Sequence, residues 1–271
     1  MRRIAALLAL AAPLPAGAEL KPEWELGAGA SAFELPDYRG SDESRSYVLP
    51  FPYVIYRGER LRVDRQGVRG MFFESERVEL DLSMNATPPV DEKNRARDGM
   101  PHLHPTIEIG PRLNLILLRD RPNGRALTLR LPVRAVVATD FSDARWAGLT
   151  AYPHLSADLR PGGWNVGVQA GPLFATRRYH DYFYSVEPQF ATVERPAYDA
   201  RGGYSGAVGL ASITRRFEKM WIGAFARYDV LKGAAFHSSP LVRRDHALMW
   251  GVAVAWVFAE SPRHVDVDVE D

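Results

Sequence analysis

The sequence of 271 residues contains no cysteine, so no disulfide bond holds the chain together. After residue 18, no segment has 18 consecutive apolar residues, which excludes a hydrophobic membrane-spanning helix. No long segment repeats apolar residues with the 3.6-residue period of an amphipathic helix either. The length of the chain allows one large all-β domain.

Residues 1–18 have the features of a secretory signal peptide. Arg2 and Arg3 form a positive start, residues 4–14 are an apolar run, and residues 16–18 (Ala-Gly-Ala) are a cleavage site of small residues. Without the two arginines, the formal charge changes from +1 to −1, which gives no reason to expect nucleic acid as a partner. We expect an exported protein of the periplasm or outer membrane of a Gram-negative cell.

Apolar and polar residues alternate along most of the remaining chain, beginning with residues 24–33 (WELGAGASAF). The pattern is typical of β-strands, whose successive side chains point to opposite faces. It recurs at 78–86, 107–117, 127–137, 149–159, 221–231 and 247–258, and in a weaker, glycine-rich form at 164–174 and 204–217. We interpret residues 47–56 and 61–73 as strands interrupted by prolines and glycines.

These segments are about 9–11 residues long, the length of a strand that crosses a bilayer at a tilt. Their connections alternate between tight turns and long polar loops, as in outer-membrane barrels. The turns are at 57–60, 119–125, 160–163 and 218–220, and the loops are at 36–46, 87–104, 139–148, 175–203 and 232–246. Dividing residues 61–73 near Gln66 gives twelve strands with every long loop on one rim; ten strands are the alternative.

We therefore predict a closed antiparallel transmembrane β-barrel of about twelve strands over residues 19–258, with its apolar face toward lipid. In hydrocarbon, every backbone N–H and C=O has to be paired within the protein, which only a helix or a closed barrel achieves. A soluble β-sandwich is the alternative. Aromatic residues near the strand ends are expected to form interfacial girdles. They are Trp24, Phe33, Tyr47, Tyr53, Trp146, Tyr152, Trp164, Trp221, Tyr228, Trp256 and Phe258.

Five short motifs occur in order along the predicted barrel. They are YRGSD at 38–42, IGP at 109–111, YDARGGY at 198–204, SSPLV at 238–242 and WVF at 256–258. In these motifs and their order, residues 24–258 resemble the MipA/OmpV family of outer-membrane proteins. The resemblance implies an outer-membrane barrel without catalytic residues or cofactors. It also implies a scaffold that links a lytic murein transglycosylase to a penicillin-binding protein, although some members are described as porin-like.

The chain departs from a typical barrel at its end. Barrel proteins usually finish on the aromatic residue of the last strand, but here Phe258 is followed by residues 259–271, which are acidic toward their end. We expect an unstructured periplasmic tail, with a docking peptide for a periplasmic partner as the alternative.

Charged residues occupy the face of the alternating segments that is predicted to line the lumen. Charges of both signs in a narrow cylinder tend to pair, because an unpaired buried charge is costly. In particular, Glu108, Arg112 and Arg130 lie on neighbouring strands, close enough to pair. Paired charges favour a closed or very narrow pore, whereas separated acidic and basic walls favour a selective channel. The predicted lining is Glu25, Glu79, Asp81, Glu108, Arg112, Arg130, Arg134, His154, Asp158, Arg227 and Asp229.

Two further constellations are candidates for chemistry. His154, Ser156 and Asp158 share one face of a strand, and the His-x-Ser pair resembles that of outer-membrane lipid A deacylases. Our alternation places all three in the lumen, away from acyl chains, so we do not expect catalysis there. His102 and His104 lie in a loop with Asp91, Glu92 and Asp98, and such a set could bind a transition metal. Because no fixed scaffold is predicted for this loop, we favour a solvated loop over a metal site. His180 and Asp181, among aromatic residues, are expected to pack within a loop.

The sequence thus predicts a signal peptide at 1–18, a barrel at 19–258 and an acidic tail at 259–271. The leading functional hypothesis is a non-enzymatic scaffold of the envelope machinery without cofactor, in contact with outer-membrane lipid and lipopolysaccharide. Its contacts with partners would come from the arginine-bearing turns and from the tail. A narrow diffusion channel is the second hypothesis, and a lipid-modifying enzyme is the third.

Overall fold

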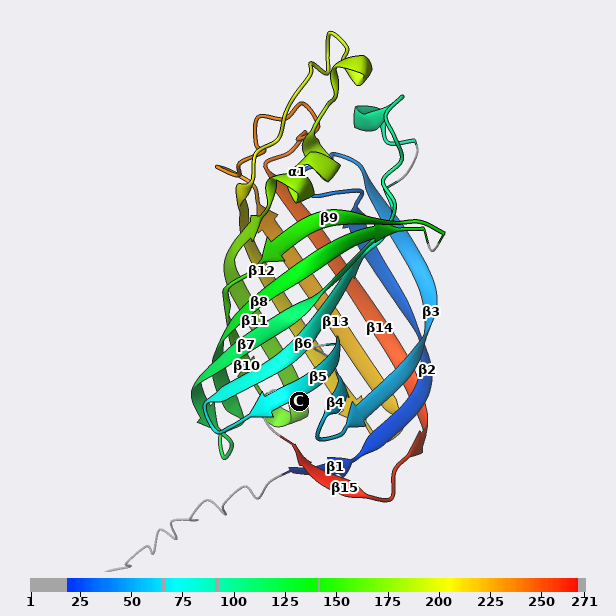
Figure 1. Cartoon of the computed structure of the whole chain (residues 1–271). Coiled ribbons are helices and arrows are strands. Elements are labelled where there is room, and N and C mark those ends of the chain that lie inside the picture. Colours follow the sequence, from blue (N-terminus) through cyan, green and yellow to red (C-terminus); the bar gives the residue numbers. More distant parts are fainter. Residues whose placement is uncertain (1–18, 65–66, 91–92, 141, 268–271) are drawn as a thin grey trace, which may run out of the picture.

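A computed structural model describes residues 19–64, 67–90, 93–140 and 142–267. The predicted signal peptide and the last four residues therefore lie outside the described residues. The β-strands form a barrel that carries loops at one end and a two-stranded ribbon at the other (Figure 1). None of the described helices is long and apolar enough to cross a membrane.

The strands follow one another around the sheet in chain order, with antiparallel pairing throughout. The β-strands are β1 (Glu19–Pro22), β2 (Trp24–Pro36), β3 (Ser44–Arg57), β4 (Leu61–Asp64), β5 (Gly67–Glu74), β6 (Val78–Thr87), β7 (Thr106–Asp120), β8 (Arg125–Thr139), β9 (Ala144–Ala151), β10 (His154–Leu159), β11 (Trp164–Ala175), β12 (Gly203–Phe217), β13 (Met220–Val230), β14 (His246–Glu260) and β15 (His264–Val267). The helices are α1 (Arg177–Tyr184) and short 3-10 turns at Arg95–Arg97, Pro161–Gly163 and Pro188–Phe190.

The wall of the barrel has twelve strands, as predicted. β9 and β10 both pair with β8 and with β11, so they are two halves of one strand that is interrupted at Tyr152 and Pro153. Proline has no N–H to give to a ladder, which explains the interruption. The barrel closes because β14 at one end of the chain pairs with β2 at the other, from Trp250↔Glu34 to Glu260↔Glu25.

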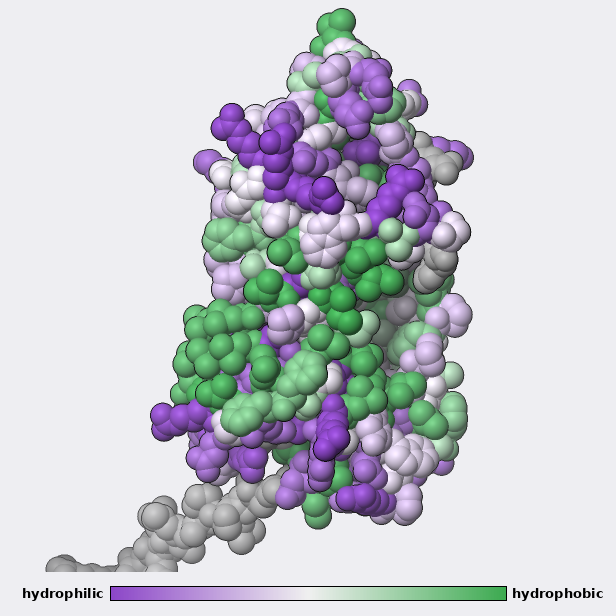
Figure 2. Space-filling view, in the orientation of Figure 1, coloured by the Kyte–Doolittle hydropathy of each residue, from purple (hydrophilic) through white to green (hydrophobic). Residues whose placement is uncertain are grey.

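The alternating sequence positions the strands as expected for a lipid-facing exterior. In β10, Leu155 is 49% exposed, whereas His154 and Ser156 on either side are buried. The outer residues of β14 are likewise exposed and apolar, from Leu248 to Phe258. Figure 2 shows a band of hydrophobic residues around the barrel, with hydrophilic residues at both ends. This is the surface that a bilayer requires of a barrel.

The aromatic girdle is only partly as predicted. Trp24, Trp146, Tyr228, Trp256 and Phe258 are half-buried or exposed on the outside, but five of the predicted girdle residues belong to the interior. Tyr53 and Tyr152 are buried, and Phe33 and Trp221 line an internal cavity together with Tyr152. Tyr47 stacks on Phe33, with 5.2 Å between ring centroids. The prediction failed for Phe33, Tyr47, Tyr53 and Trp221 because they lie at odd positions of β2, β3 and β13, which face inward, and for Tyr152 because it lies at the interruption between β9 and β10.

The loops at one end form a packed plug over the mouth of the barrel. We define the plug as residues 37–43, 88–90, 93–105, 176–202 and 231–245. Its aromatic centre is Tyr184 and Phe236, whose rings stack at 3.7 Å and which are 2% and 0% exposed. Three hydroxyl groups tie the loops together, since Tyr38 donates to the Leu241 carbonyl, Tyr184 to the Arg39 carbonyl and Ser239 to the Tyr184 carbonyl. The loops predicted as polar thus contribute the largest apolar cluster in the described chain.

Two predicted boundaries are wrong. The loop at 139–148 is much shorter, because β9 begins at Ala144 and pairs Ala144↔Thr139. The β8–β9 ladder has a register shift beside Gly148, whose φ is +107°, a conformation that glycine adopts readily. Pairing continues on both sides of this shift. The tail is structured from Ala259 to Val267, since β14 continues to Glu260 and β15 pairs with β1 from His264↔Pro22 to Val267↔Glu19. Val265 and Val267 alternate with polar residues, as in a β-strand, and β15 pairs with the edge of β1.

We predict that Phe236→Ala loosens the plug without unfolding the barrel. The substitution leaves a cavity beside the Tyr184 ring, and such changes in a packed core cost about 3–5 kcal/mol. Trypsin should cleave the loop at 176–202 much faster in the variant. The heat-dependent mobility of the folded barrel in SDS gels should stay unchanged. Val193→Ala, in the same loop but fully exposed, is the control and should leave cleavage unaltered. Equal cleavage of both variants would contradict the packed plug.

Candidate functional site

The predicted lumen residues all lie inside the barrel wall, at three levels. Nine of them are buried, and Arg134 and Arg227 are half-buried. Each belongs to a strand in which the neighbouring residues face outward, so period-2 alternation positions all of them. The pairs of opposite charge that they form are the main polar content of the lumen.

The level nearest the turn end centres on Glu25 of β2. Its Oε1 accepts a hydrogen bond from Arg57 at 2.8 Å, and its Oε2 accepts one from Arg216 at 3.0 Å. Arg216 also lies 3.7 Å from Glu260 at the end of β14. These contacts join β2, β3, β12 and β14 across the lumen, so the barrel is tied together at this level.

The middle level consists of arginine–carboxylate pairs between β6, β7, β8 and β10. Arg112 donates to both oxygens of Asp81, at 2.7 Å for the closer Nη2 contact, and Arg119 donates to Glu79 at 2.9 Å. Arg130 lies 3.6 Å from Asp158. Arg134 donates to the Ser83 hydroxyl at 2.7 Å and lies 3.8 Å from Glu108. The grouping of Glu108, Arg112 and Arg130 expected from sequence is therefore wrong in detail, because each takes a different partner.

The level nearest the plug centres on Asp229 of β13, which is fully buried. This carboxylate accepts hydrogen bonds from Arg39 and, at 2.8 and 3.0 Å, from Arg227. Arg39 also donates to the Ser205 carbonyl at 2.8 Å. Arg39 belongs to the plug, so Asp229 connects the plug to the barrel wall. Sequence reasoning missed Arg39, although it lies within the YRGSD motif.

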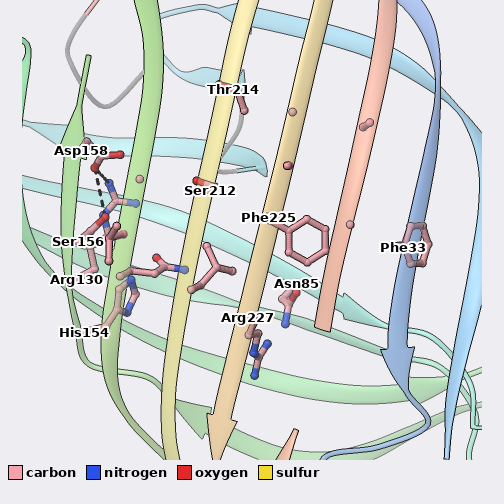
Figure 3. A pocket seen from close by; sticks show the side chains of 18 of the residues that line it. Phe33, Asn85, Arg130, His154, Ser156, Asp158, Ser212, Thr214, Phe225 and Arg227 are labelled. Carbon is pink, nitrogen blue, oxygen red and sulfur yellow. Dashed lines mark hydrogen bonds and ion pairs between the residues drawn. The ribbon is translucent and has the colours of Figure 1, made fainter. Parts of the chain in front are cut away.

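His154, Ser156 and Asp158 face the lumen, but they do not form a nucleophile–base pair. His154 Nδ1 lies 2.7 Å from the Tyr152 carbonyl oxygen, and its ring stacks on Tyr152 at 4.2 Å. The Ser156 hydroxyl donates to Asp158 at 3.3 Å. Figure 3 shows these side chains on one wall of the cavity. The geometry therefore lacks the contact between base and hydroxyl that nucleophilic catalysis needs.

The loop that contains His102 and His104 offers few ligands for a metal ion. The rings of His102 and His104 contact edge to face at 5.2 Å, and His104 Nδ1 lies 3.9 Å from Asp140. Asp91 and Glu92, which the sequence grouped with them, lie outside the described residues. Within the described part of the chain, no three His, Asp or Glu residues cluster closely enough to hold a metal.

Two cavities occupy the lumen between the plug and the turn-end charges. The lower cavity has a volume of about 510 Å³, and the upper cavity, beneath the plug, has about 320 Å³. They share Asn85, Arg134, Tyr152, Phe225 and Arg227 among their lining residues, so they adjoin each other. Both volumes lie within the usual range of small-ligand sites, about 300–1,000 Å³.

The lower cavity has one charged wall and one apolar wall. The charged wall contains Arg112, Arg130, His154 and Asp158 from β7, β8 and β10. Phe225 and Phe33 lie on the opposite side, as Figure 3 shows. The sequence signal for the apolar wall was Phe225, which lies two residues before Arg227 and therefore on the same, inward face of the strand.

We predict that Asp229→Asn destabilises the barrel by about 3–5 kcal/mol, because it leaves Arg39 and Arg227 without their carboxylate. Denaturant unfolding in detergent, followed by tryptophan fluorescence, measures the change. Asp199→Asn is the matched control, since Asp199 forms an exposed pair with Arg177 that is expected to contribute less than about 1 kcal/mol. Equal effects of the two substitutions would rule out a structural role for the Asp229 pairs.

The plug is expected to loosen in acid through His180 of α1. Its Nδ1 lies beside the Arg201 carbonyl oxygen and its Nε2 beside the Ser205 hydroxyl, with Phe236, Tyr179 and Tyr184 around the ring. Burial lowers the pKa of His180, the Arg39 cation acts in the same direction, and the Arg201 carbonyl and Asp181 oppose them. The unfolded plug therefore binds a proton more readily than the folded one, so stability is complete above about pH 6.5 and falls below it.

Hydrogen exchange of α1, corrected for the intrinsic effect of pH, measures this loosening. We expect the opening equilibrium to rise by up to about tenfold for each pH unit below about 6.5. His180→Asn, which keeps a donor for the Arg201 carbonyl but does not titrate, should remove the dependence. The same slope in both proteins would show that another group is responsible.

Comparison with solved structures gives distant similarities to outer-membrane barrels. The chain is 10% identical to the CymD monoaromatic hydrocarbon channel, covering 89% of this chain and 90% of that chain, with a TM-score of 0.38. It is 10% identical to outer membrane phospholipase A from Escherichia coli, covering 91% and 94%, with a TM-score of 0.36. It is 9% identical to the outer membrane protein OprG from Pseudomonas aeruginosa, covering 88% and 94%, with a TM-score of 0.21. The comparison with curated proteins gives no match.

The comparison with protein families gives a match over nearly the whole barrel. The model described as MltA-interacting protein MipA matches residues 27–258, from β2 to β14. The resemblance seen in the sequence motifs is thereby confirmed. With its closed twelve-stranded barrel, the chain belongs to the MltA-interacting protein MipA family and is an outer-membrane barrel.

Proposed function

We propose that the protein is a non-enzymatic scaffold of the Gram-negative cell envelope, with a partner-binding face at the turn end of the barrel. In this proposal the turn end faces the periplasm and the plug faces outward. The observation that carries it is the ribbon of β1 and β15, which both chain ends build beside the turns (Figure 1). The ribbon adds a structured surface to the turn end of the barrel.

The ribbon and the barrel enclose a groove that suits a protein segment. Its volume is about 580 Å³, and Lys21, Arg160, Arg216 and His264 line it together with the carboxylates of Glu25, Glu218 and Glu260. Further arginines lie in the turns of the same end, at 57–60 and 121–125. Arginine suits the recognition of carboxylates on a partner. The family description, MltA-interacting protein, favours a protein partner. The resemblance noted in the sequence implies a lytic murein transglycosylase and a penicillin-binding protein.

The interior supports an anchoring role more than conduction. The plug covers the mouth, and arginine–carboxylate pairs occupy the lumen at three levels. A narrow diffusion channel remains the second candidate, supported by the two adjoining cavities in the lumen. Planar-bilayer recording separates the two, since a scaffold should be silent and a channel should give stepwise currents. A lipid-modifying enzyme is the third candidate. Its test compares the mass of lipid A from cells that express Ser156→Ala and from cells that express the parent protein. Identical masses would exclude modification of lipid A by Ser156.

We predict that partner binding depends on the ribbon. Removing residues 261–271 deletes β15 and should weaken the binding of a purified lytic transglycosylase at least tenfold, while the barrel stays folded. Arg160→Glu in the groove should do the same. Arg178→Glu, an exposed charge reversal in the plug, is the control and should bind normally. Undiminished binding by the shortened chain and by Arg160→Glu would exclude this face.

A further inference from the structure

The barrel wall is incomplete where the short hairpin of β4 and β5 stands between β3 and β6. β3 pairs with β4 at Tyr56↔Val63 and Arg57↔Arg62, and the β5–β6 ladder ends at Gly70↔Leu82. Among the residues that the structure describes, no strand pairs with 47–54 of β3 or 83–87 of β6 on their facing sides. We call the space between these two edges the lateral window. Strands β13 and β14 are visible through it in Figure 1, and Figure 2 shows a hollow there.

The β3 edge has few donors to leave unpaired. The Arg57 N–H donates to the Glu23 carbonyl on the β2 side. Because N–H directions alternate along a strand, the backbone nitrogens at 48, 50, 52 and 54 point to the window. Two of these four are Pro50 and Pro52, which have no N–H. Proline at such positions is a known means of keeping an edge unpaired, and each unpaired donor that it removes would cost several kcal/mol in hydrocarbon.

The window lies at the level of the bilayer and is closed toward the plug. Val48, Val54, Phe72 and Met84 around it are exposed apolar residues on the outer face. Above it, the Asn94 amide donates to Asp37 at 2.7 Å, and Arg95 donates to Glu43 at 2.8 Å. These contacts fasten the loop after β6 to the loop before β3. The opening therefore faces acyl chains and not the water above the barrel.

The internal cavities reach this window. Met84 and Asn85, which lie on the free edge of β6, line the lower cavity. The upper cavity is likewise lined by Ala86, Thr87 and Pro88, at the end of the same edge. Both cavities therefore extend to the free edge of β6 at the window.

An apolar path leads from the window into the lumen. Tyr47, Phe33, Gly251 and Phe225 lie in one register row across β3, β2, β14 and β13. Gly251 leaves room between the two phenylalanines, since a Cβ there would lie 2.7 Å from each. The inner face of β14 is apolar along this path, with Met249 and Ala253 on either side of Gly251.

The upper cavity is lined by three arginines, one of which has an unsatisfied donor. Arg39, Arg134 and Arg227 line it together with Asp37 and Glu108, and Asp229 pairs with both Arg39 and Arg227. Arg39 is 92% buried, as its exposed fraction is 8%, and its Nη1 has no hydrogen-bond partner among the described residues. An anion is the ligand that such a guanidinium is suited to bind.

We propose that the two cavities bind one single-chain amphiphile with an anionic head, of the fatty-acid type, which enters from the bilayer through the lateral window. The acyl tail lies along the aromatic row in the lower cavity. The carboxylate meets Arg39, Arg134 and Arg227 beneath the plug. This site is independent of the partner-binding face at the turn end, so either proposal stands if the other fails.

Binding is tested with the full-length protein in lipid nanodiscs, using oleate that displaces a fluorescent polyene fatty acid. We expect saturable binding of one oleate per barrel, at least tenfold tighter than that of oleyl alcohol, which has the same tail without the charge. Ala253→Trp fills the lower cavity and should weaken oleate binding at least tenfold. Ala32→Trp, on the lipid face of the adjacent strand, is the matched control and should bind normally. Absent saturable binding, or equal affinity for oleate and oleyl alcohol, overturns the proposal, as does undiminished affinity in folded Ala253→Trp.

The route of entry is tested by cysteine reactivity, because the chain has no cysteine of its own. Leu49→Cys places a thiol at the window, where Leu49 is 47% exposed, and Ala255→Cys places one in the packed lower wall. In liposomes, an N-alkyl maleimide that partitions into the bilayer should modify Leu49→Cys at least tenfold faster than a sulfonated maleimide in the water. Ala255→Cys should react with neither. Equal rates of the two reagents at Leu49→Cys would overturn lateral entry.

Discussion

The structure depends on the pairing of backbone polar groups in hydrocarbon, where water is absent and each unpaired group costs several kcal/mol. The pairing of β14 with β2 satisfies this requirement by closing the sheet. Register shifts beside Gly148 and at Val257 keep the ladder continuous through irregularities. The two free edges at the lateral window are the exception, and Pro50 and Pro52 reduce the number of exposed donors there.

Charge pairing is the second constraint, and it closes the barrel along its axis. Arginine and carboxylate side chains that would be costly alone are paired within the lumen, from Glu25 at the turn end to Asp229 beneath the plug. Because Asp229 also binds Arg39, the plug is attached to the wall by charge as well as by its aromatic core. An anchor with a rigid interior suits a scaffold, and its sideways opening adds a site for an amphiphile.

Local periodicity made much of the fold predictable. Alternation specifies which residues of β7, β8 and β10 face lipid, and it placed the charged lining inside. It could not give the partner of each arginine, because that depends on register between strands: Arg112 faces Asp81 and not Glu108. The plug was missed because its core joins residues far apart in sequence, such as Tyr38 and Leu241. The pairing of β15 was missed because a strand of four residues is too short for alternating apolar and polar residues to be recognised.

The central claim is that the alternating strands turn one face to acyl chains and the other to an enclosed lumen. The most direct measurement is oxygen accessibility of spin labels placed singly along residues 247–258 of β14 in liposomes. The account predicts maxima at the even positions from Leu248 to Phe258 and minima at the odd positions. Uniform accessibility along the strand, or maxima at the odd positions, would contradict it.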